Sequence, residues 1–83
     1  MKILACYDNE GKTYDRYTVY YDEPLTAGLH TCRGMSEQPC HPQGFGQMST
    51  GCLGEHNGKK IDFEELPEPC KCLVQRDLDP ETT

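Results

Sequence analysis

Tryptophan is absent from the 83 residues of this sequence and phenylalanine occurs only twice, so large apolar side chains are scarce. A chain of this length buries only about 60–65% of the surface that its unfolded form exposes. We therefore expect a single domain spanning residues 1–83 with a thin core. The five tyrosines should supply much of the buried surface, with their hydroxyls reaching water or a partner.

Long apolar runs are also missing. No stretch approaches the roughly 20 apolar residues that a membrane-spanning helix needs. Near the start, only the five residues from Ile3 to Tyr7 are consecutively apolar, which is too short for the core of a signal peptide. The sequence therefore predicts a cytoplasmic protein with no membrane partner, whose six cysteines are reduced thiols or metal ligands rather than disulfides.

Basic residues are few. Eight lysines and arginines face fourteen acids, which gives a formal net charge of -6. The imbalance is concentrated at the end of the chain, where Ile61 to Thr83 holds seven acids and two bases. Such a chain is repelled by phosphate backbones and anionic lipid, so we expect no direct binding to nucleic acid. The charge favours a protein partner with a basic surface.

Cysteine pairs of the C-x2-C type, which zinc sites commonly use, do not occur. Two looser pairs remain, Cys52 with His56 and Cys70 with Cys72, and they leave a zinc-stapled module open as an alternative. Disulfides are a further alternative, since six cysteines can pair in 15 ways. The simplest interpretation makes Cys70 a core thiol and Cys72 a surface thiol. We predict no metal and no cofactor.

Catalytic motifs are missing as well. There is no Gly-x-Ser-x-Gly nucleophile turn. Cys40 and His41 are adjacent, but neighbouring side chains in an extended segment point apart, so this pair does not by itself bring a thiolate to its base. The sequence predicts a protein that is not an enzyme.

What is present favours a small sheet. Lys2 to Tyr7 is a short apolar run typical of a buried strand, and Thr13 to Tyr21 alternates with the period of two expected of a second strand. Leu29 to Arg33 predicts a third strand. Lys59 to Ile61 predicts a short edge strand, because lysines at an edge discourage edge-to-edge aggregation.

The second predicted strand has two distinct faces. The core-facing set is Tyr17, Val19 and Tyr21, and the opposite set is Tyr14, Arg16, Thr18 and Tyr20. Asp15 is in phase with the core-facing set, where a carboxylate needs a partner such as Arg33 or backbone N–H groups of a loop. The alternative is that the sheet frays at this end and leaves Asp15 exposed.

A helix is predicted at the end of the chain. Its apolar residues fall at helical spacing and form one stripe: Leu66, Cys70, Leu73, Val74 and Leu78. Pro67 suits the first helical position and Pro80 should stop the helix. We therefore predict an α+β fold: an antiparallel sheet of three to four strands, a long Gly/Pro loop, and one C-terminal helix packed on the sheet.

The Gly/Pro loop spans Gly34 to Gln47. It contains two prolines and three glycines and shows no hydrophobic period. This composition excludes a helix or a central strand. Glycines around Phe45 can turn backbone N–H groups toward one point and form an anion site, with glutamine amides beside it. The alternative is an ordered loop in which Met35 and Phe45 plug the sheet.

Several short motifs are distributed along the chain: Asp8, Gly11, Lys12, Thr13, Asp15-Arg16-Tyr17-Thr18, Met35-Ser36, Pro39, the run from Pro42 to Gln47, and Leu66-Pro67. Taken together, they resemble those of a group of small uncharacterised proteins of phage and plasmid genomes. The resemblance implies no activity. It implies a setting, because short genes of mobile elements often encode regulators or inhibitors of host defence.

These observations predict a small acidic interaction protein, a phage-type regulator or inhibitor of a host defence protein that engages a basic surface. A small-ligand module that binds a nucleotide-like molecule in the 34–47 loop is the other alternative, and a homodimer stays open. The residues expected to bind a partner or ligand are Asp15, Arg16, Tyr20, His41, Gln43, Gly44, Phe45 and Gln47.

Overall fold

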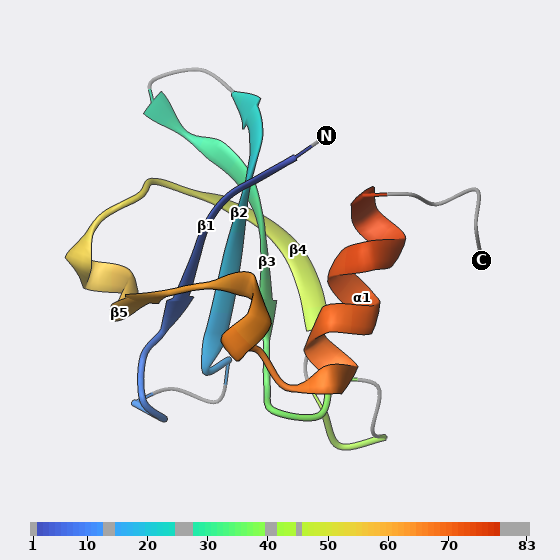
Figure 1. Ribbon diagram of the computed structural model, residues 1–83. Helices are drawn as coiled ribbons and strands as arrows, with labels where there is room; N and C mark the ends of the chain where they lie inside the picture. Colours follow the sequence, from blue (N-terminus) through green and yellow to red (C-terminus); the bar gives the residue numbers. More distant parts are fainter. Residues whose placement is uncertain (1, 13–14, 25–27, 40–41, 45, 79–83) are drawn as a thin grey trace.

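The computed structural model describes residues 2–12, 15–24, 28–39, 42–44 and 46–78 (Figure 1). Within these residues the chain forms five strands and one α-helix, with two short 3-10 helices. The strands are β1 (Ile3–Asp8), β2 (Tyr17–Pro24), β3 (His30–Met35), β4 (Gly46–Gly51) and β5 (Lys59–Ile61), and the helices are η2 (Glu55–Asn57), η3 (Phe63–Glu65) and α1 (Glu68–Leu78). The described helices fall short of the length and apolar character needed to cross a membrane.

All five strands belong to one antiparallel sheet in the order β4-β3-β2-β1-β5. The first four strands follow one another as a meander, and β5 returns to pair with β1. This confirms the α+β class, the first three strands in outline and the edge strand at Lys59–Ile61. The expected strand number of three to four was too low, because β4 carries almost no strand-forming residues and was not predicted.

The long loop from Gly34 to Gln47 is shorter than expected. Gly34 and Met35 end β3, whereas Gly46 and Gln47 begin β4, and the two strands pair over six residues from Met35↔Gly46 to His30↔Gly51. The connection is therefore limited to residues 36–45. Ladder hydrogen bonds to β3 compensate for the weak strand propensity of β4. Cys40, His41 and Phe45 lie outside the described residues, so the expected plugging by Phe45 is not tested.

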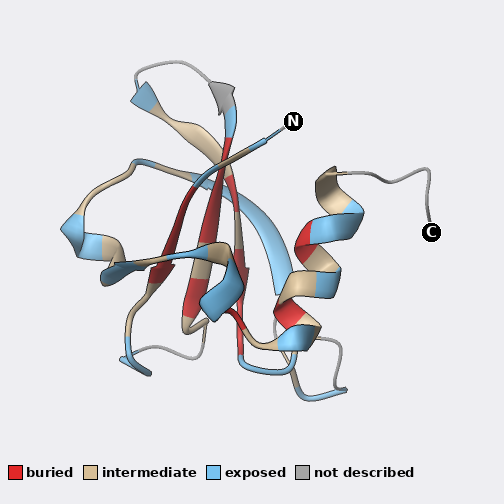
Figure 2. Cartoon of the chain, in the orientation of Figure 1, coloured by how far each residue is buried: buried red, intermediate tan, exposed pale blue. Residues whose placement is uncertain are grey.

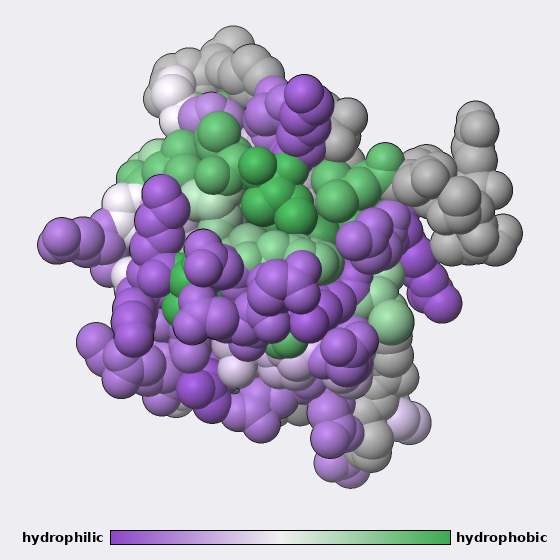
Figure 3. Space-filling view, in the orientation of Figure 1, coloured by the Kyte–Doolittle hydropathy of each residue, from purple (hydrophilic) through white to green (hydrophobic). Residues whose placement is uncertain are grey.

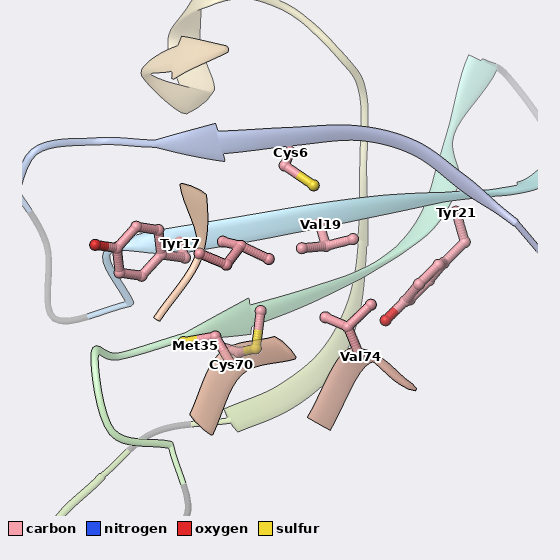
Figure 4. Close-up of a cluster of buried hydrophobic side chains, with 8 residues drawn as sticks. Cys6, Tyr17, Val19, Tyr21, Met35, Cys70 and Val74 are labelled. Atoms are coloured by element: carbon pink, nitrogen blue, oxygen red, sulfur yellow. The ribbon is translucent and has the colours of Figure 1, made fainter. Parts of the chain in front are cut away.

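The main core lies between the sheet and α1 (Figure 4). The helical stripe is confirmed within α1, which packs onto the sheet through Cys70 and Val74, both 0% exposed. The helix begins at Glu68, so Leu66 and Pro67, expected as the first residues of the stripe and of the helix, lie just before it. Buried side chains of this cluster come from β1, β2, β3 and the helix side: Cys6, Tyr17, Val19, Tyr21, Met35, Leu66, Cys70 and Val74. Figure 2 shows the buried residues concentrated in the central strands, with β4 exposed at the edge.

A charged clamp joins the end of α1 to the sheet. Arg33 on β3 donates two hydrogen bonds to the Asp77 carboxylate, from Nε to Oδ2 at 2.5 Å and from Nη2 to Oδ1 at 2.6 Å. The Tyr21 hydroxyl donates to the same Oδ2 at 2.5 Å. Arg33, one of the partners considered for Asp15, is thus paired with Asp77 instead.

Candidate functional site

A groove of about 290 Å³ lies on the face of the sheet opposite α1. The residues that line it come from β2, β3, β4, η2 and the segment before β2: Asp15, Thr18, Tyr20, Cys32, Gly34, Gln47, Ser49, Thr50 and Asn57. Its floor is buried and its β4 rim is exposed. It is therefore an open, polar hollow on a rigid sheet.

Tyr20 forms a buried part of the groove floor. This side chain is only 2% exposed and packs edge-on against Tyr7, with ring centroids 5.8 Å apart. Its hydroxyl donates to Asn57 Oδ1 at 2.8 Å, which ties η2 to the sheet. Burial raises the pKa of Tyr20 to about 12, so the hydroxyl keeps the proton that it donates. Tyr20, expected on an open face as a partner anchor, is instead a buried support, because Leu53 and η2 cover this part of the sheet.

Gly34 makes the hollow possible. It lies in β3 between Thr18 of β2 and Gln47 of β4, and it pairs with both. Because side chains on one face of a sheet stand side by side, a residue without a side chain between two others leaves a gap at that point. The groove therefore forms where Gly34 occupies the middle position of the row Thr18, Gly34, Gln47 across β2, β3 and β4.

Asp15 gives the groove its charge. It is the single charged residue among the described residues that line the hollow. Its negative charge adds to burial in raising the pKa of the Cys32 thiol above its ordinary value. Cys32 is thus a neutral thiol in the groove floor, and the net field in the hollow favours a cation.

The position of Asp15 distinguishes between the two expectations for this residue. Of the two expectations for Asp15, the core face beside Tyr17 and Val19 was wrong, since Asp15 lines the opposite face with Thr18 and Tyr20. The alternative, a strand that does not extend to Asp15, fits the structure. The reason is that β2 begins at Tyr17, so Asp15 precedes the strand and does not follow its alternation. The structure brings Asp15, Tyr20 and Gln47 together in one groove.

Arg16 lies elsewhere. Its guanidinium binds the Asp8 carboxylate with two hydrogen bonds, at 2.8 and 3.1 Å, and Glu37 Oε1 with a third at 2.5 Å. It also lies over the Tyr17 ring, 5.2 Å from the centroid. The hydrogen bond from Arg16 holds the pKa of Asp8 below its usual range. Arg16 therefore ties β1, β2 and the segment after β3 together.

Two of the remaining expected residues, Gln43 and Gly44, are not among the described residues that line the groove. Gln43 and Gly44 lie in the connection between β3 and β4, and His41 and Phe45 lie outside the described residues. Sequence reasoning missed six lining residues: Thr18, Cys32, Gly34, Ser49, Thr50 and Asn57. The alternation of Thr18 with Tyr20 was the available signal for the β2 side of the groove, whereas Asn57 was interpreted only as part of a turn.

Potential metal ligands are scattered over the described part of the chain. The described residues contain no group of three or more His, Cys, Asp or Glu side chains placed to hold an ion. Cys52 Sγ lies 3.9 Å from His56 Nε2, so this expected pair is close in space and supplies two ligands at most. Cys70 is buried and Cys72 is exposed, as the helical stripe predicted.

Comparison with known proteins returned no family model, no curated protein and no solved structure that matches the chain. The groove and the surface around it are therefore the observations from which a function is inferred.

Proposed function

We propose that this protein is a small acidic interaction protein that binds a basic segment of a partner protein at the groove. The observation that carries the proposal is the groove itself, where Asp15 lies among neutral hydrogen-bonding side chains and no described lining residue is basic. A lysine or arginine side chain can donate hydrogen bonds to a carboxylate such as Asp15 and to the polar rim formed by Gln47 and Ser49.

The surface charge supports the same kind of partner. The chain carries a formal net charge of -6, and acids that face solvent steer a basic molecule toward it. Glu64 in η3 and Glu68 at the start of α1 each have more than four-fifths of the side chain exposed, and Lys71, which pairs with both, neutralises them only in part. Figure 3 shows hydrophilic side chains over the lower part of the molecule in the view of Figure 1, where η3 and the start of α1 lie.

The shape of the groove favours a macromolecule over a small ligand. Pockets for small molecules enclose about 300–1,000 Å³ and cover most of the ligand. This groove is at the lower limit of that volume and opens onto the exposed strand β4. The nucleotide-like ligand would also need Arg16, which is held by Asp8 and Glu37 away from the groove.

The resemblance to proteins of phage and plasmid genomes supports a host defence protein as the partner. In that setting the protein acts as a regulator or inhibitor, and binding by itself is the activity. No covalent chemistry is required of the groove. Among the described residues that line it, the one thiol is Cys32, and its raised pKa keeps it neutral.

The test is capture of basic proteins from a host lysate by the wild-type protein, by Asp15→Asn and by Glu64→Gln. The two variants remove the same charge, one inside the groove and one away from it. We expect Asp15→Asn to weaken retention about tenfold, because a hydrogen bond to a charged group contributes about 1.5–3 kcal/mol. Glu64→Gln should bind nearly as wild type.

Melting temperatures of both variants, measured first, separate loss of binding from loss of fold. Equal retention by Asp15→Asn and the wild type, with both folded, would mean that the groove is not the binding site. Capture of no basic protein at all would contradict the function itself.

A further inference from the structure

Strand β4 forms one edge of the sheet and pairs with β3 alone among the described strands. Its residues from Gly46 to Thr50 are all exposed, and Gly51 is half-buried (Figure 2). In an antiparallel pair, every second residue of an edge strand directs its N–H and C=O groups away from its neighbour. The outer side of β4 is therefore a row of backbone donors and acceptors.

The two edges of the sheet differ in how they are protected. At the other edge, β5 has only three residues and two of them are the exposed lysines Lys59 and Lys60. Short length and charge are the usual devices that prevent another strand from adding to an edge. Strand β4 has six residues, no charged side chain and no proline. It lacks the protection that the opposite edge has.

The groove continues directly from this open edge. Gln47 and Ser49 of β4 line the groove, so their side chains point to the face opposite α1. A strand added to β4 would lie about 4.8 Å away and place alternate side chains beside them. A long basic side chain on that strand can extend across β4 toward the hollow at Gly34, on the side where Asp15 supplies the charge.

The other face of the edge is suited to the same arrangement. Gly46 packs against α1, since a Cβ there would lie 2.8 Å from Leu73 Cδ2, so the helix closes this end of β4. Met48 lies beyond it, with 40% of its surface exposed. An added strand therefore finds an apolar contact on one face and a polar, negatively charged groove on the other.

We propose that β4 accepts an extended basic segment of the partner as a sixth strand of the sheet, with a lysine or arginine laid over the groove toward Asp15. This inference rests on the proposed function and names its mode of recognition. Backbone hydrogen bonds to β4 supply affinity, and the charge of the groove selects the side chain.

A second copy of the chain fits the edge less well. Its β4 contains no lysine or arginine to place over the groove. Each copy also carries a net charge of -6, so two copies repel one another. A basic partner has neither disadvantage.

The test uses two synthetic peptides of about eight residues, the length of a strand. Lysine alternates with valine in one, and glutamate alternates with valine in the other. Hydrogen exchange of the backbone amides is measured with each peptide in excess. We expect the lysine peptide to slow exchange at alternate β4 residues by at least tenfold, and the glutamate peptide to leave it unchanged.

Two matched variants test the edge itself. Met48→Lys puts a charge on β4, and Leu4→Lys makes the same change on β1, where Leu4 is 43% exposed. We expect Met48→Lys to weaken binding of the lysine peptide at least tenfold relative to Leu4→Lys. Equal binding by the two variants would overturn the edge as the docking site.

The outcomes separate this inference from the function beneath it. Binding that depends on Asp15 but leaves the β4 amides unprotected overturns strand addition and leaves the groove as the site. Failure of the lysine peptide to bind overturns strand addition, while capture of a basic protein from lysate still decides the function. A native mass of two chains, with β4 protected without peptide, would show that the occupant is a second copy.

Discussion

At the scale of single residues, Gly51 and Tyr20 show how tightly side chains pack beside the groove. A Cβ at position 51 would lie 2.7 Å from the Tyr20 hydroxyl, so glycine leaves the space in which that hydroxyl reaches Asn57. The requirement is one of contact across two strands rather than of backbone conformation. Substitution of either residue should therefore be felt by the other.

We expect Gly51→Ala to destabilise the protein by about 1–3 kcal/mol, the usual cost of overpacking. In a Tyr20→Phe background the same change should cost less, because the clashing oxygen is gone. Urea unfolding of the four proteins of this cycle measures the difference. An equal cost in both backgrounds would mean that the contact with the hydroxyl is not what excludes a side chain at position 51.

Asp8 provides a residue-scale prediction for pH. Arg16 lowers the pKa of this carboxylate in the folded protein, so the ionised form stabilises the fold. This contribution is present above the unfolded pKa of about 4 and is lost as the pH falls through the lower folded value.

Asp8→Asn should therefore lose stability at pH 7 and lose less than the wild type on acidification below about pH 4. Urea midpoints at both pH values measure the effect, with Glu55→Gln, a change at an exposed acid, as the control. Parallel losses in the wild type and Asp8→Asn would contradict it.

At the scale of elements, the end of α1 depends on Asp77. The side chains of Arg33 and Asp77 are 13% and 11% exposed, so removal of the carboxylate leaves a largely buried guanidinium without its partner. We expect Asp77→Ala to destabilise the protein by about 3 kcal/mol. Glu68→Ala, which removes an exposed pair with Lys71 on the same helix, should change stability by less than about 1 kcal/mol. Thermal unfolding compares the two, and similar losses would mean that the clamp is not what holds α1.

The elements also differ in how well the sequence predicted them. The stripe of α1 and the alternation of β2 are local patterns, and both were visible in the residues themselves. Strand β4 was not, because Gly46 to Gly51 offers neither apolar alternation nor β-branched residues except Thr50. It forms a strand because it pairs over six residues with β3, to which the connection of residues 36–45 joins it.

At the scale of the whole molecule, the alternatives with a metal can be tested directly. The described residues bring Cys52 and His56 together, but hold no group of three or more His, Cys, Asp or Glu side chains, and two ligands do not complete a zinc site. We expect the melting temperature of protein purified from cells to be unchanged by EDTA, and its native mass to equal that of the apo chain. A lower melting temperature with EDTA would restore the zinc-stapled module, with Cys40 and His41 as further ligands to test.

The sequence by itself determined what depends on neighbours along the chain. The acidic charge, the helical stripe that ends at Leu78, and the lysines of the β5 edge are read from residues a few positions apart. Tertiary structure decided what depends on residues far apart. It brought Tyr20 into hydrogen-bond contact with Asn57 and paired Arg33 with Asp77. It also placed Asp15 and Gln47 in one groove, on either side of the gap at Gly34. The physical reason is that strand pairing and side-chain contact across a sheet are set by register, which short sequence patterns do not specify for a strand as polar as β4.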